Sequence, residues 1–205
     1  MNGGQAVLPL ENPRETAVRL LAGFAGFGTA AVNLAISSSL FAAGGLPGHP
    51  WPMPLATAAA IWGVALLGWT VAALRNSSFP LPGWSAVLLP AAAAVHLLAI
   101  VTGGSGNMAG LNVSHLAALL LTLTIIAAQG WLRRQALGRT DDGGLPGTDS
   151  PAGASGAGRM LAAAFAGAVA VAAIATPGLA ASAAGQFAVP HGSHFDSGAG
   201  GHHGP

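Results

Sequence analysis

The chain has 205 residues, of which 52% are hydrophobic and only 6% are charged, and its formal net charge is +1. A soluble domain carries about 25% charged residues, so this composition excludes an ordinary soluble enzyme, while the high hydrophobicity excludes a disordered chain. The absence of cysteine excludes disulfides and thiolate metal ligands. No basic cluster indicates a nucleic-acid partner. We therefore expect an all-α integral membrane protein whose main partner is the lipid bilayer.

Five apolar segments are each long enough to cross a bilayer, which takes about 20 helical residues. Short loops rich in glycine and proline separate the first four segments, and a longer Asp-, Gly-, Pro- and Ser-rich stretch precedes the fifth. The expected spans are residues 17–42, 54–74, 84–101, 113–132 and 160–181. The corresponding regions are an N-terminal cytoplasmic segment (1–16), a four-helix transmembrane region (17–132), a flexible cytoplasmic linker (133–158), a fifth transmembrane helix (159–181) and a His/Gly-rich tail (182–205).

The arginines predict the orientation of these spans. The chain has no lysine, and its basic residues are Arg14, Arg19, Arg75, Arg133, Arg134, Arg139 and Arg159. A cytoplasmic N-terminus followed by five spans places all seven on the cytoplasmic side, where positive charge is retained. The C-terminal tail is then extracytoplasmic. The abundance of Gly and Ala is typical of a GC-rich bacterial genome, so we expect a bacterial plasma membrane.

Small residues recur at helical spacing in the first and fifth spans. Gly23, Gly26 and Ala30 form one such series, and Ala163, Gly167 and Ala170 form another. Small faces let membrane helices approach closely. Because Gly and Ala are abundant along the whole chain, we expect composition rather than specific packing to account for both series.

The end of the fifth span also resembles the exit of a signal sequence. Small residues surround Ser182 in an A-x-A-like pattern. Cleavage there would release a short peptide that carries histidines. We keep this as the less favoured alternative to a retained span.

Ionisable residues are almost missing from the interior of the spans, with His96 as the exception. Asn33 and Gln129 are polar but not ionisable. This pattern argues against a proton pump, a voltage sensor or a channel with a charged ring. A small transporter is also disfavoured, because no paired broken helices occur.

The tail contains the densest group of metal-ligating side chains. His191, His194 and Asp196 form an H-x-x-H-x-D pattern, and His202 and His203 follow a glycine-rich stretch. Neutral imidazole is the commonest protein metal ligand, and it suits copper and zinc. We predict a transition-metal site here, and the alternative is a solvated tail.

A second candidate group lies at the outer ends of the third and fourth spans. His96, Met108 and His115 bracket this helical hairpin, so the two imidazoles can face each other, and thioether with imidazole suits Cu(I). The alternatives are a helix–helix hydrogen bond from His96, an interfacial position for His115 and plain packing for Met108. A pair of axial haem ligands is a weaker alternative, because the two rings would need similar depths and the expected span ends place them about 5 Å apart along the membrane normal.

No catalytic arrangement occurs in the sequence, and we expect a non-enzyme. The leading hypothesis is copper or zinc handling at the outer membrane face, in uptake, delivery or assembly of a metalloenzyme client. The alternative is a structural accessory subunit that binds other membrane subunits, in a respiratory or monooxygenase-type complex.

Overall fold

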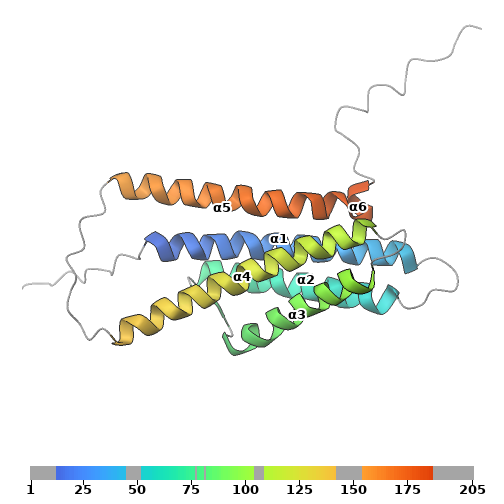
Figure 1. Ribbon diagram of the computed structural model, residues 1–205, viewed down its shortest axis with the longest axis horizontal. Helices are drawn as coiled ribbons and strands as arrows, with labels where there is room; N and C mark the ends of the chain where they lie inside the picture. Colours follow the sequence, from blue (N-terminus) through green and yellow to red (C-terminus); the bar gives the residue numbers. More distant parts are fainter. Residues whose placement is uncertain are drawn as a thin grey trace, which may run out of the picture.

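All regular structure in the described part of the chain is helical. The computed structural model describes residues 13–44, 52–76, 78–80, 82–103, 109–141 and 154–186. Their helices are α1 (Pro13–Gly44), α2 (Pro52–Arg75), α3 (Pro82–Thr102), α4 (Ala109–Asp141), α5 (Ala154–Ala180) and α6 (Ala183–Gln186) (Figure 1). The first five are long and apolar enough to cross a membrane, as the sequence predicts. The chain is thus a multi-pass membrane protein by the length and composition of its helices.

Proline sets the start of three helices. Pro13, Pro52 and Pro82 are the first residues of α1, α2 and α3, where the missing N–H has no helical partner in any case. Pro90 and Pro177 lie inside α3 and α5. Internal proline is tolerated in membrane helices because neighbouring groups satisfy the carbonyl that loses its donor.

Helical structure reaches into two regions that the sequence predicts as linker and tail. α4 continues through Asp141 and α5 begins at Ala154, so both ends of the expected linker are helical. The residues after Leu132 are mostly good helix formers, which explains the extension of α4. The start of the tail is also not free, because α6 packs on α1 and α5 and the Ala183 N–H donates to Ser39 Oγ at 2.8 Å.

α1 and α4 form the centre of the bundle. α1 is the most buried of the five long helices and packs against α2, α4 and α5. Apolar side chains such as Val32, Ile36, Leu121 and Ile125 fill the space between α1 and α4. By their backbone contacts α2 packs only on α1 and α3 packs only on α4 among the described elements, so the backbones of α2 and α3 stay apart. The bundle therefore stays open between α2 and α3.

Glycine allows close approach of α1 to α2, and here the expectation of mere compositional bias is wrong. A Cβ on Gly26 would collide with the side chain of Thr70, and one on Gly23 would lie 2.8 Å from Leu74 Cδ2. In α5, Gly167 faces Leu21 of α1. The small residues of α1 thus serve a specific helix contact, which composition alone does not reveal.

Buried hydroxyl groups connect the helices. Ser37 Oγ donates to the Ala56 carbonyl of α2 at 2.7 Å, and Ser114 Oγ of α4 donates to the Gly178 carbonyl of α5 at 2.7 Å. Such bonds stabilise helix pairs where lipid supplies no alternative partner.

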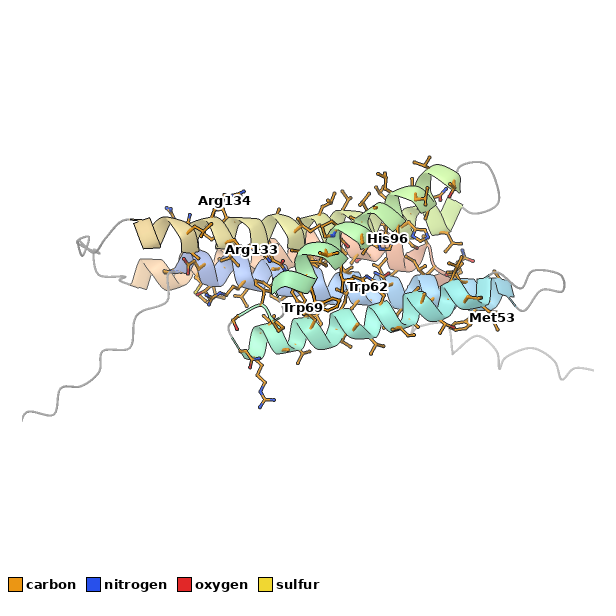
Figure 2. The ribbon with its side chains drawn as sticks, turned by 90° about the horizontal axis from the view of Figure 1, so that it is seen from below. Met53, Trp62, Trp69, His96, Arg133 and Arg134 are labelled. Carbon is orange, nitrogen blue, oxygen red and sulfur yellow. The ribbon has the colours of Figure 1, made fainter. Side chains whose placement is uncertain are left out.

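Successive long helices alternate in direction (Figure 1). This alternation brings the start of α1, with Arg14 and Arg19, to the same end as Arg75 and the last third of α4. Figure 2 shows Arg133 and Arg134 toward that end and Met53 at the opposite end. The described arginines thus share one end of the bundle.

The Gly26 contact gives a stability prediction. Gly26→Ala should lower the free energy of unfolding by about 1–3 kcal/mol relative to Gly68→Ala. The reason is that Thr70 is β-branched and stiff, whereas the space around Gly68 is open to at least 4 Å. Both changes alter helix propensity alike, so the difference isolates the contact. Unfolding in detergent measures it, and equal stabilities would contradict the account.

Candidate metal centre

His96 of α3 and His115 of α4 contact each other. Their Nδ1 atoms lie 3.1 Å apart, and the ring centroids are 5.4 Å apart with the planes tilted by 47°. The sequence-based expectation that these two rings face each other is confirmed. The helix–helix hydrogen-bond partner of His96 Nδ1 is therefore His115 and not Asn33.

The geometry of the α3–α4 hairpin explains this meeting. His96 and His115 are equally far along the chain from the middle of the connection between residues 105 and 106, and such positions lie side by side in an antiparallel pair. Asn112 Nδ2 donates to the Gly103 carbonyl at 3.3 Å, which ties the start of α4 to the end of α3. The hairpin register therefore places the rings at one depth.

One nitrogen of this pair has no hydrogen-bond partner. His96 is only 5% exposed, and its Nε2 has no partner within the described ranges. In the Nδ1 contact one ring carries the proton and the other accepts it, which requires opposite tautomers of the two neutral imidazoles.

The 3.1 Å spacing of the two Nδ1 atoms is that of adjacent ligands of one metal ion, but the ring centroids, 5.4 Å apart, lie almost in line with both atoms. The two nitrogens therefore point at each other as in a hydrogen bond, and both rings would have to turn to share an ion. An ion about 2.0 Å from each nitrogen would subtend an N–metal–N angle of about 100° across the 3.1 Å gap. That value lies between square-planar and tetrahedral angles. Ligands on opposite sides of an ion would be about 4 Å apart, so the pair as placed fits neither linear Cu(I) nor trans-axial haem iron.

The other sequence-predicted ligands fall outside the residues described. They are Met108, His191, His194, Asp196, His202 and His203. Within the described ranges, no group of three or more His, Cys, Asp or Glu side chains is close enough to hold a metal ion. Among the described residues, the structure thus brings together two of the eight predicted ligands. A complete metal site would need further ligands besides these two.

A pocket of about 410 Å³ borders the histidine pair. Leu55, Ala59 and Trp62 of α2 form one wall, and α3 forms the opposite wall with Leu88, Ala92 and His96 among its residues. Its floor includes Asn33 and Ile36 of α1, and His115 also borders it. The Nδ2 of Asn33 donates to the Thr29 carbonyl at 2.8 Å, so its Oδ1 is the remaining acceptor. The pocket volume lies in the range of small-molecule sites.

Sequence reasoning missed this pocket. The short connection between α2 and α3 predicts that these helices are neighbours, and nothing in their composition indicates that they stay apart. The two tryptophans of α2 also differ in the structure. Trp69 Nε1 donates to the Pro80 carbonyl at 2.9 Å and its ring stacks on Phe79, whereas the buried Trp62 Nε1 has no partner in the described part of the chain.

No family model, curated protein or solved structure matches this chain. The function is therefore inferred from the chemistry of the site. Two imidazoles at chelating distance, beside an apolar pocket, can bind a metal ion or share one proton.

The contact between the histidines predicts a measurable coupling. His96→Phe and His115→Phe should each lower the free energy of unfolding. The double variant should lose less of this free energy than the sum of the two single losses, by about 0.6–1.7 kcal/mol. The reason is that either change already removes the shared hydrogen bond. Unfolding in bicelles gives the four free energies. The pair His115→Phe with Ser85→Ala is the control, since distant sites add, and additivity in the histidine pair would contradict the contact.

Proposed function

We propose that this protein handles a transition metal, zinc or copper, at the outer face of a bacterial plasma membrane. The observation that supports this most directly is the 3.1 Å spacing of His96 Nδ1 and His115 Nδ1. Zinc and Cu(II) accept imidazole ligands at adjacent positions, and the spacing favours these ions over linear Cu(I).

The arginine distribution supports the outer position of this site. The described arginines share one end of the bundle, and the positive-inside rule assigns that end to the cytoplasm. His96 lies six residues before the end of α3 at Thr102, about 9 Å along the helix from the opposite end. The pair would then open toward the outer half of the bilayer.

The tail would supply the capturing ligands in this proposal. His191, His194, Asp196, His202 and His203 follow α6, whose contact with α1 and α5 holds the start of the tail beside the bundle. An ion captured by the tail would pass to His96 and His115, with Met108 in the same hairpin as a further ligand. The role is delivery or uptake rather than catalysis.

The histidine pair predicts metal binding in a chain that ends at Pro190 and therefore lacks the tail ligands. This chain should bind about one Zn(II) or Cu(II), and His96→Phe or His115→Phe should weaken binding by more than about tenfold. Gln129→Leu is the control, because Gln129 is buried between α3 and α4 at the other end and accepts from Ser85 Oγ at 3.3 Å. Metal titration of purified protein measures the affinities. Equal binding in all variants would contradict a site at the pair.

Comparison of the full chain with the chain that ends at Pro190 tests the tail. The full chain should bind additional metal, and more tightly, because five further ligands are present. If both chains bind the same amount with the same affinity, the tail is not the capture site. Elemental analysis of protein isolated from its native membrane without nickel affinity shows which ion it carries. The same preparation shows whether other subunits co-purify, the result expected of an accessory subunit.

A further inference from the structure

A pocket of about 210 Å³ lies between the start of α3 and the last third of α4, at the end of the bundle that carries the described arginines. Its lining residues are Phe79, Ser85, Gln129, Leu132, Arg133 and Ala136. Ser85 Oγ donates to Gln129 Oε1 at 3.3 Å, so these two side chains contact each other. The charged residue of the lining is Arg133, and it gives the pocket a positive wall.

Arg133 and its neighbour Arg134 differ in their relation to this pocket. Both side chains are exposed, but only Arg133 lines the pocket. Figure 2 shows the two residues on different sides of α4. Arg133 also has an interaction within the protein. Because a guanidinium has five N–H donors, Arg133 can keep that interaction and still donate to a bound anion.

The depth of the pocket follows from the length of α3. α3 has 21 residues and is about 31 Å long, which equals the thickness of a hydrocarbon core of about 30 Å. Its start at Pro82 therefore lies at the boundary of the core. Ser85 and Gln129 meet across the antiparallel helices, so Arg133, four residues beyond Gln129, lies within about 2 Å of the level of Pro82. The pocket is thus placed where phospholipid headgroups begin.

Two tryptophans support this depth independently. Trp84 lies in the first turn of α3 and is 67% exposed, and Trp131 precedes Arg133 by two residues. Tryptophan is enriched at the membrane–water interface, where its amphipathic ring lies at the level of the headgroups. The polar groups that reach this pocket from the bilayer are therefore headgroup phosphates.

The charges around the pocket favour a lipid with net negative charge. The side chains described at this end include one carboxylate, Glu15, against the five arginines Arg14, Arg19, Arg75, Arg133 and Arg134. The start of α3 adds the partial positive charge of a helix N-terminus. A zwitterionic headgroup brings its own cation into this field, whereas an anionic headgroup does not. Charge complementarity therefore selects an anionic phospholipid.

We propose that this pocket binds the phosphate of one anionic phospholipid from the leaflet at the arginine-bearing end of the bundle. The guanidinium of Arg133 donates to the phosphate oxygens, a pairing that is often bidentate. Phe79, Leu132 and Ala136 contact the glycerol and the first methylene groups, and the acyl chains stay in the bilayer. This inference does not depend on metal at the histidine pair, which lies toward the other end of α3.

The test uses the delipidated full chain in a non-ionic detergent and native mass spectrometry to measure the Kd of the first bound lipid. The probes are phosphatidylglycerol and phosphatidylcholine with the same acyl chains, and glycerol 3-phosphate serves as a soluble competitor. One phosphatidylglycerol should bind at least several-fold more tightly than phosphatidylcholine. Glycerol 3-phosphate at the same concentration should not displace it, because it has no chains to hold it at the membrane boundary.

Paired variants locate the site. Arg133→Gln should weaken phosphatidylglycerol binding about three- to tenfold, whereas Arg134→Gln removes the same charge outside the pocket and should change it by less than about twofold. Ala136→Phe fills the pocket and should also weaken binding. Gln135→Phe is its matched control, since Gln135 is exposed on the same helix and does not line the pocket.

Equal losses in Arg133→Gln and Arg134→Gln would overturn the proposal, because diffuse attraction would then explain the binding. Equal Kd values for the two lipids would exclude selection of an anionic headgroup. Displacement by glycerol 3-phosphate at the same concentration would show a site for soluble phosphate esters instead of a lipid. Arg133→Gln should leave the metal content unchanged, and His96→Phe should leave lipid binding unchanged. A failure of the metal proposal is therefore distinguishable from a failure of this one.

Discussion

Polar groups inside this bundle must find partners within the protein, because hydrocarbon offers none. The contact between His96 and His115 meets this requirement, because it pairs an imidazole of α3 with an imidazole of α4. The hydroxyl bonds from Ser37 and Ser114 follow the same rule and fix α2 and α5 to the central helices. Among the described residues the rule fails at four buried atoms, which are Trp62 Nε1, Thr70 Oγ1, His96 Nε2 and Gln129 Nε2. Trp62 and His96 border the open pocket between α2 and α3, whereas Thr70 and Gln129 do not.

The sequence predicts the number of long helices and the meeting of the two histidines for clear physical reasons. A run of about 20 apolar residues has few alternatives to a membrane helix, and a short connection forces α3 and α4 into an antiparallel hairpin. Their near-equal distances from the turn then bring His96 and His115 to one depth. These arguments use only local length and chain order, which the sequence contains directly.

The packing of helices that do not follow each other is not predictable in this way. In the sequence nothing distinguishes Gly26 from the other glycines of this glycine-rich chain. Its importance follows from the contact with Thr70 of α2, which only the structure shows. The open pocket between α2 and α3 arises because each packs on a different central helix, which depends on side-chain fit across the whole bundle. Trp62 and Trp69 are both tryptophans on the same face of α2, yet only Trp69 Nε1 donates to the carbonyl of Pro80. Tertiary contacts decide these differences.

A metal ion bound by both Nδ1 atoms would place the ring protons on the Nε2 atoms, and metal-bound histidines almost always donate that proton to an oxygen acceptor. The most direct test of the metal site is X-ray absorption at the zinc or copper edge of the loaded full chain. The account predicts imidazole nitrogens at about 2.0 Å and, in His96→Phe, a loss of metal and of imidazole scattering from this site. An unchanged spectrum and metal content in His96→Phe and His115→Phe would contradict it.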